Sequence, residues 1–378
     1  MVTGSRADWG LLKPVADAIA KDASLQLQLI ATGSHLEAQY GNSIEHIRAD
    51  GHEPDVEIPL KLQTDSPASI THAMARALHG MADAYEQLQP QLILLLGDRY
   101  EILAAAQAAL IAKIPVAHIA GGDVTEGAFD DAIRHAISKL SHIHFATNQA
   151  AQKRLLQMGE NPAHVHLTGS PALDQIRDME LLSQAQLQQS LGMSLNKPLL
   201  LVTYHPVTLA KQTGANELEA LLSALDHFSD KVSYVITGSN ADTHGQSINQ
   251  RLQQYTEQHD NCGFFMHLGQ QRYYSLMQLA DAVVGNSSSG LYEAPSFNTP
   301  TVNIGDRQKG REMADSVINC DNSTDAIVTA IKQALDRGKQ AAINPYGDGH
   351  AVEKIMAVLK KPIKAADLIR KPFFEISS

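Results

Sequence analysis

Short, mostly apolar runs recur along the chain and alternate with stretches in which apolar residues follow a helical period. Runs of this length and composition predict strands buried in parallel sheets. The predicted strands are Leu25–Ala31, Leu92–Leu96, Val116–Ile119, His142–Thr147, Val165–Leu167, Leu199–Thr203, Val232–Thr237, Ala282–Gly285 and Thr301–Ile304. The predicted helices include Leu11–Lys21, Ile102–Ala112, Leu182–Leu191, Glu217–Phe228, Tyr274–Leu279 and an amphipathic helix from Val352 to Leu359. Alternation of strands and helices indicates an α/β fold.

The 378 residues are too many for one ordinary core, and they predict two domains. The joint falls near Gly169–Pro171, which gives a first domain over 1–172, a second over 173–355 and a C-terminal segment over 356–378. The first strand is unusual, because only Met1, Val2 and Thr3 precede the loop that begins at Gly4. A central strand has about five or six residues. We therefore expect that a few residues of the natural first strand are absent from this sequence.

Polar motifs rich in glycine follow the predicted strands in both halves. They are Gly4–Arg6, Gly33–His35, Gly97–Arg99, Gly121–Asp123, Tyr204–Pro206, Gly238–Asn240 and Asn286–Gly290. The carboxyl ends of parallel strands line the ligand crevice of doubly wound sheets. The pattern predicts two Rossmann-like domains whose motifs face an interdomain cleft, a common place for a small-molecule site.

Two kinds of residue in these motifs suit a phosphate group. The run Asn286–Gly290 offers hydroxyl and backbone N–H donors at a helix start, although ordinary capping would also use a serine there. Arg6, Arg99 and Arg307 each follow a strand, and arginine binds phosphate with two parallel donors. Each is also compatible with a plain surface arginine.

Acid–base chemistry is suggested by three positions. Asp98 follows five apolar residues and a glycine, where burial of its carboxylate would raise its pKa and favour proton transfer; a structural hydrogen bond is the alternative. Asp130 and Asp131 open a helix, and one of them is expected to cap it while the other faces the cleft. His205, between a strand and Pro206, is either a proton shuttle or a packed histidine.

Composition narrows the class of protein. The net charge of -11 argues against binding nucleic acid, and the two cysteines, Cys262 and Cys320, suit a reducing compartment. No apolar run is long enough for a membrane span, and the N-terminus lacks a signal-peptide pattern, so a cytoplasmic protein is expected. His135, His142 and His144 match no zinc spacing, and no G-x-G-x-x-G follows the first strand. The sequence predicts no metal and no cofactor.

Several long motifs, in order, resemble the hydrolysing UDP-N-acetylglucosamine 2-epimerases, specifically the sialic-acid-pathway branch. The resemblance covers nearly the whole chain. Its motifs are TGSRADWGLL (3–12), ATGSH (31–35), GDRYE (97–101), HIAGGDVTEGAFDDAIRHAISKLSH (118–142), TGSPALD (168–174), TYHPVT (203–208), SNADTHG (239–245), VGNSSSGLYEAP (284–295) and NIGDRQKGRE (303–312). It implies a GT-B fold, with the last helix returning to the first domain, and a homodimer or homotetramer.

The resemblance also implies the reaction. UDP leaves with loss of the C2 proton to give a 2-acetamidoglucal; water then adds at C1 and a proton returns to the opposite face of C2. UDP-N-acetylglucosamine would give N-acetylmannosamine and UDP for sialic acid synthesis. The catalytic residues implied are Asp98, Asp130 and His205. The residues implied for UDP are Arg6, Arg99, Asn240, His267, Leu268, Ser287, Ser288, Ser289, Gly290, Glu293 and Arg307.

One position departs from the family pattern. Many relatives carry a catalytic glutamate immediately before the Gly-Gly pair, where this chain has Ala120. Asp123 is the replacement we expect, with Glu126 as the next candidate. The same motifs are compatible with UDP-2,4-diacetamido-2,4,6-trideoxyglucose, the substrate of a legionaminic acid branch. A GT-B glycosyltransferase and a two-lobed solute-binding protein are the competing classes.

Overall fold

The structure, a computed structural model, describes residues 1–38, 42–61, 64, 66–124, 129–205, 215–228, 232–238, 245–362 and 365–375. It divides into two compact units. The first comprises Met1–Gln175 and Tyr346–Ser378, and the second comprises Ile176–Pro345. The C-terminal segment therefore rejoins the first unit at Tyr346, earlier than the position 356 expected from sequence.

The first unit is built on parallel strands. Its described strands are β1 (Val2–Thr3), β2 (Ile30–Thr32), β3 (Val56–Ile58), β4 (Ile93–Leu96), β5 (Val116–Ile119), β6 (Ile143–Ala146) and β7 (Val165–Leu167). They pair in the orders β1-β2-β3 and β4-β5-β6-β7, and every pairing is parallel. The short β1 also contacts β4.

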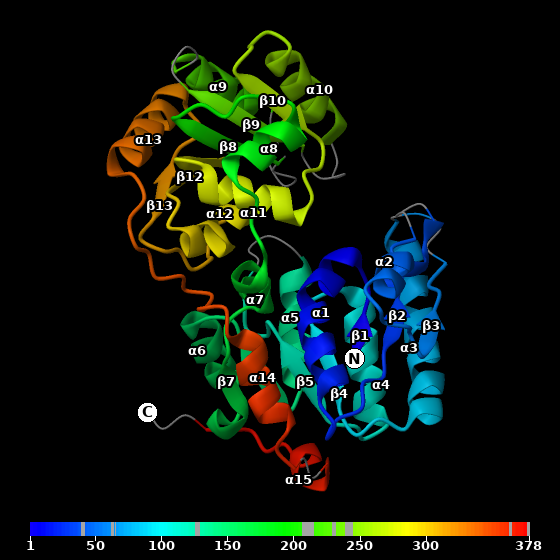
Figure 1. Ribbon diagram of the computed structural model, residues 1–378. Helices are drawn as coiled ribbons and strands as arrows, with labels where there is room; N and C mark the ends of the chain where they lie inside the picture. The colour runs from blue at the N-terminus through cyan, green and yellow to red at the C-terminus, as the bar shows by residue number, and fades with distance from the viewer. Residues whose placement is uncertain are drawn as a thin grey trace. The chain divides into compact units, whose positions relative to one another are not determined.

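Helices cover both faces of these strands (Figure 1). They are α1 (Arg6–Lys21), η1 (Gly33–Leu36), α2 (Ile44–Ala49), α3 (Pro67–Leu88), α4 (Tyr100–Ile111), α5 (Phe129–Leu140), α6 (Gln149–Gln157), η3 (Pro162–His164), α7 (Pro171–Asp178), α14 (Ala351–Leu359) and α15 (Ala365–Ile369). Side chains alternate along a strand, so Ile93 and Leu95 pack with α3 and α4, whereas Leu94 and Leu96 pack with α1 and α14.

The second unit holds a six-stranded parallel sheet in the order β10-β9-β8-β11-β12-β13. The strands are β8 (Leu199–Thr203), β9 (Ser233–Thr237), β10 (Cys262–Phe265), β11 (Ala282–Gly285), β12 (Thr301–Ile304) and β13 (Val317–Cys320). The described helices are α8 (Gln184–Leu191), α9 (Ala215–Asp226), α10 (Gly245–Thr256), α11 (Gln270–Leu279), α12 (Ser289–Tyr292), η4 (Ala294–Phe297) and α13 (Thr324–Arg337). Helices α8 and α11 pack on one face, and α9, α10 and α13 on the other.

Polar side chains cap the N-terminal ends of several helices. Ser5 accepts a hydrogen bond from the Asp8 backbone N–H at 3.2 Å and so caps α1. Asn148 caps α6 in the same way, through the Ala151 N–H at 2.8 Å. These caps satisfy N–H groups that the first turn of a helix leaves unpaired.

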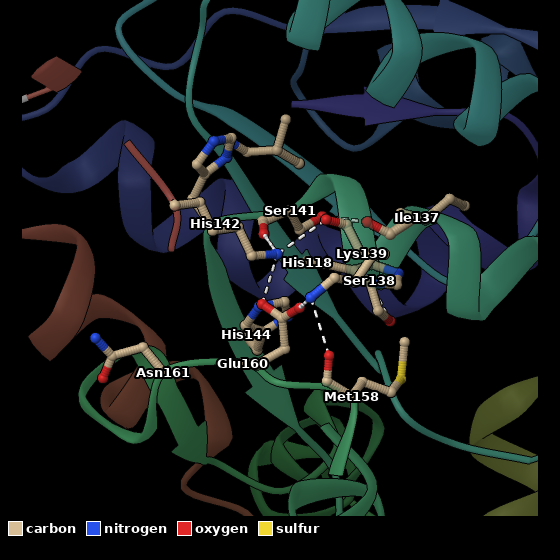
Figure 2. Close-up of polar contacts among 12 residues, drawn as sticks. His118, Ile137, Ser138, Lys139, Ser141, His142, His144, Met158, Glu160 and Asn161 are labelled. Carbon is tan, nitrogen blue, oxygen red and sulfur yellow. Dashed lines mark hydrogen bonds and ion pairs between the residues drawn. The ribbon is translucent and has the colours of Figure 1, made fainter. Parts of the chain in front are cut away.

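The C-terminal segment is held to the first unit by a buried carboxylate. Glu160 accepts hydrogen bonds from Lys139 and His144, each at 2.8 Å (Figure 2), and from Lys371 at 2.5 Å. Burial alone would raise the pKa of Glu160, but these hydrogen bonds lower it to about 2. The charged network therefore ties Lys371, near the chain end, to α5 and β6.

All nine predicted strands are present, with shifts at some ends, and the six predicted helices are present too. Three strands were missed: β3, β10 and β13. None of the described helices is both long and apolar enough to cross a membrane.

Candidate active site

Asp98 lies in the loop that follows β4, at the carboxyl end of the strand. Its carboxylate accepts a hydrogen bond from the Arg134 guanidinium of α5, and both side chains are mostly buried. A charge-assisted contact of this kind orients both groups. Arg134 was not singled out from sequence, although it lies four residues after Asp130, on the same helix face.

Asp130 occupies the first turn of α5, close enough to Asp98 for their charges to interact. Burial and then the negative charge of Asp98 raise the pKa of Asp130, while Arg99 and Arg134 oppose the rise. The two carboxyl groups therefore differ in environment: Asp98 is paired with a cation, whereas burial favours the protonated form of Asp130. Such a difference is the usual basis for separate acid and base roles.

Asp123 has well-defined partners at the start of α6. Its carboxylate accepts hydrogen bonds from the Thr147 hydroxyl at 2.8 and 2.9 Å and from the Asn148 amide at 2.9 Å. The backbone turns sharply before it, since Ala120 has a φ of 62° and Gly122 a φ of 78°. A positive φ is uncommon for a residue other than glycine and is frequent at functional sites. Glu126 lies outside the described residues.

A buried acidic pair beside Arg99 was missed by the sequence patterns. Glu101 is fully buried and accepts a hydrogen bond from the Arg99 Nε at 2.5 Å. Burial raises the pKa of Asp8 to about 6, with Arg99 opposing and Glu101 adding to the rise. Both acids lie in motifs already noted, Asp8 two residues after Arg6 and Glu101 two after Arg99. Arg6 itself is exposed at the start of α1.

In the second unit the three serines follow β11. The Tyr273 hydroxyl lies 2.6 Å from the Ser289 hydroxyl, which in turn lies 3.0 Å from that of Ser287. Ser288 occupies the N-cap position of α12, but its side chain makes no capping hydrogen bond. Ordinary capping therefore does not account for Ser288. Gly290 has a packing role, because a Cβ there would lie 2.6 Å from Thr301 Cγ2.

Asn286 joins His205 and Arg307 in the same unit. Its side chain accepts from the His205 N–H at 2.7 Å and donates to the His205 carbonyl at 2.8 Å. The Asn286 carbonyl accepts from Arg307 at 3.1 Å and from Gln308 at 2.8 Å. One buried residue, through its side-chain amide and its main-chain carbonyl, thus holds together the loops that follow β8, β11 and β12.

Glu293 ends α12 and carries an unusual carboxyl group. Burial raises the pKa of Glu293 to about 8, opposed by its own backbone N–H and by Arg311, and its Oε2 atom has no partner among the described residues. Leu268 is buried and His267 is exposed, in the segment after β10. Asn240 lies outside the described residues. No group of three or more His, Cys, Asp or Glu within the described part of the chain could hold a metal ion.

Two units of parallel strands flanked by helices are Rossmann-like, and together they define an α/β protein of the GT-B type. A crystal structure of UDP-GlcNAc 2-epimerase from Neisseria meningitidis bound to UDP-GlcNAc has this fold, with a TM-score of 0.75, 20% identity, and coverage of 96% of this chain and 99% of that chain. A family model described as UDP-N-acetylglucosamine 2-epimerase matches residues 17–360. The chain belongs to the UDP-N-acetylglucosamine 2-epimerase family.

Two relatives narrow the comparison further. A GDP/UDP-N,N'-diacetylbacillosamine 2-epimerase (hydrolyzing) from Campylobacter jejuni is 40% identical, over 89% of this chain and 86% of the relative. A UDP-N,N'-diacetylbacillosamine 2-epimerase (hydrolyzing) from Legionella pneumophila is 36% identical, over 95% of this chain and 94% of the relative. Neither name refers to sialic acid, the branch that the motifs predicted.

Proposed function

We propose that this chain is a hydrolysing 2-epimerase whose preferred substrate is UDP-N,N'-diacetylbacillosamine, the diacetamido sugar considered above. The observation that carries the chemistry is the pairing of Asp98 with Arg134 beside Asp130, whose pKa is raised. Proton removal from C2 and proton return to its opposite face require more than one acid–base group. Two neighbouring carboxyl groups in different environments, one paired with a cation and one with a raised pKa, supply that requirement.

In the proposed reaction, a base takes the C2 proton while the bond between C1 and the UDP oxygen breaks. The products of this step are a C1–C2 double bond in the sugar and free UDP. Water then adds its hydroxyl at C1, and a proton is delivered to the other face of C2. Asp98 is assigned as a proton acceptor and Asp130 as a donor, with His205 as a further candidate for the phosphate or the proton.

UDP is assigned to the second unit, where serine hydroxyls and Arg307 lie next to one another around Asn286. Helix α12 has four residues, so its dipole is small, and the hydroxyl groups and Arg307 carry the assignment. Glu293 suits the ribose, because hydroxyl groups would provide hydrogen bonds to its buried carboxyl. Arg6, Arg99, Asn240, His267 and Leu268 remain candidates for the same ligand.

The sugar is assigned from the names of the relatives. Both relatives described above are named for N,N'-diacetylbacillosamine, which supports that substrate for this chain. UDP-N-acetylglucosamine is the second candidate, because the matching family carries its name. The reaction at C1 and C2 is the same for the two sugars, so the acid–base assignment does not depend on this choice.

Turnover in deuterated water tests the proposal. With UDP-N,N'-diacetylbacillosamine, GDP-N,N'-diacetylbacillosamine and UDP-N-acetylglucosamine as the panel, we expect the highest kcat/KM for the first. Mass spectrometry and NMR of the free sugar should show inversion at C2 and one deuterium there, because the returning proton comes from solvent. A free sugar that keeps its original hydrogen at C2 would rule out elimination. Absence of free sugar without an acceptor would favour a glycosyltransferase.

Two substitutions in the candidate UDP site test the phosphate assignment separately. Ser288→Ala and Arg307→Ala should each weaken UDP binding by about 10- to 10²-fold, the range for losing one hydrogen bond to a charged group. Isothermal titration calorimetry with UDP measures the change. Lys332→Ala is the control, because it removes one positive charge from the exposed surface of α13. Unchanged affinity in both test variants would contradict the phosphate assignment.

A further inference from the structure

His118 is a buried residue of β5 that the proposed mechanism does not use. It is fully buried in a strand flanked by β4 and β6. Its Nε2 atom lies 2.8 Å from the carbonyl oxygen of Gly97, the residue before Asp98. Its Nδ1 atom lies 3.2 Å from the hydroxyl of Ser138 on α5. One imidazole thus contacts both the loop that carries Asp98 and the helix that carries Asp130.

Three residues of α5 that take part in these contacts lie on one face of the helix. Asp130, Arg134 and Ser138 follow one another at four-residue spacing, which places them along one face of α5. Arg134 binds the Asp98 carboxylate, and the next residue on this face, Ser138, contacts His118. The contacts close a ring from Gly97 to Asp98, Arg134, Ser138, His118 and back to Gly97.

Hydrogen-bond donors and acceptors determine the state of the imidazole. A carbonyl oxygen only accepts, so Nε2 must carry the proton that binds Gly97. Burial lowers the pKa of His118 to about 3, with His144, Arg134 and His135 acting in the same direction and the Gly97 hydrogen bond opposing. The ring is therefore neutral near pH 7, and its bare Nδ1 is left as an acceptor that faces the Ser138 hydroxyl, which also donates to the Arg134 carbonyl at 2.9 Å. Each nitrogen has one defined role.

The chain after β5 packs closely against the same contact. A Cβ at Gly121 would lie 2.7 Å from His118 Nδ1 and 2.8 Å from Ser138 Oγ. Only glycine allows the backbone to pass at this distance. The loop that leads to Asp123 therefore packs directly against the side chains of His118 and Ser138.

We propose that His118 is a positioning residue for the acid–base pair: by holding the Gly97 carbonyl and the Ser138 hydroxyl together, it sets the placement of Asp98 relative to Asp130. This inference rests on the proposed function. A displacement of about 1 Å at reacting groups costs up to about 10²-fold in rate. Loss of the imidazole is therefore expected to act on kcat more than on KM, since the hydrogen-bond partners of His118 among the described residues, Gly97 and Ser138, are not candidate UDP residues.

His118→Leu should lower kcat by about 10- to 10²-fold with KM nearly unchanged. His118→Gln should recover part of the loss, because its amide can still donate to the Gly97 carbonyl. His144→Leu is the matched control: His144 is also fully buried and is the register partner of His118 on β6, but it contacts Glu160 instead (Figure 2). Equal losses of kcat in the two leucine variants, or full kcat in folded His118→Leu, would overturn the proposal.

A second pair of variants avoids any change in the strand. Ser138→Ala removes the hydroxyl that contacts Nδ1 and donates to the Arg134 carbonyl at 2.9 Å, whereas Ser141→Ala removes only a buried hydroxyl that donates to the corresponding carbonyl, that of Ile137, at 2.7 Å. We expect a fall in kcat for Ser138→Ala only, and equal behaviour would again overturn the proposal. If the wild type releases no free sugar from the panel, the proposed function fails. The geometry is then tested by 15N NMR of the His118 ring, where an Nδ1–H tautomer would contradict the contacts.

Discussion

Asp98→Asn is expected to lower turnover by about 10²- to 10⁴-fold, the usual contribution of an acid–base group. The amide keeps the size and shape of the carboxylate but cannot accept the C2 proton. UDP affinity should stay near that of the wild type, because the candidate UDP residues Ser288, Glu293 and Arg307 belong to the second unit and the substitution leaves the side chains of the first-unit candidates, Arg6 and Arg99, in place. Rates of UDP release and titration calorimetry with UDP measure the two quantities.

The control for Asp98→Asn must separate lost chemistry from a lost ion pair, because the substitution leaves the Arg134 cation without a carboxylate partner. Thermal unfolding reports the structural part of the effect. Asp131→Asn is the matched variant: Asp131 is next to Asp130 on α5, and its Oδ2 atom lies 3.6 Å from the Nε2 atom of His135. It should keep full turnover. Near-normal turnover in Asp98→Asn would reduce Asp98 to an anchor for Arg134.

The strands that sequence patterns missed have a common physical reason. β3, β10 and β13 each lie at the edge of a sheet, and most of their residues are exposed or only partly buried. An edge strand does not need a continuous apolar run, and the strand pattern used for prediction is that run. Central strands such as β5 and β8 are buried at every position and were predicted from end to end.

For the candidate site, sequence motifs led to the loops but not to the side-chain partners within them. Motifs at strand ends lead to the loops that hold Asp98, Asn286 and Arg307, because parallel strands bring their carboxyl ends to one edge. Side-chain partners did not follow from spacing. Arg134 meets Asp98 across two elements, and Glu101 reaches Arg99 only because Gly4 leaves room, as a Cβ on Gly4 would lie 2.4 Å from Glu101 Oε1. Such contacts depend on packing in three dimensions.

The second substitution with a large expected effect on turnover is at Asp123. We expect Asp123→Asn to lower turnover by at least about 10²-fold, the low end for an acid–base group, with UDP affinity little changed. The reason is Ala120, which cannot transfer a proton at the position where the family resemblance leads us to expect a catalytic glutamate. The backbone after Ala120 bends through Gly121 and Gly122, and the Asp123 carboxylate is oriented by Thr147 and Asn148. An oriented carboxylate three residues from Ala120 is the replacement we assign.

The same hydrogen bonds suit a purely structural aspartate, so the decisive variant is Thr147→Val. It removes the hydroxyl that donates to both Asp123 oxygens, at nearly constant side-chain volume. If Asp123 transfers a proton, Thr147→Val should lower the unfolding temperature but keep most of the turnover that Asp123→Asn loses. If Asp123 only fastens its loop to the start of α6, both variants should lose stability to a similar degree and stay active. Loss of turnover in Glu126→Gln, with full activity in Asp123→Asn, would move the role to Glu126. Full activity in both would leave Asp98, Asp130 and His205 as the acid–base groups.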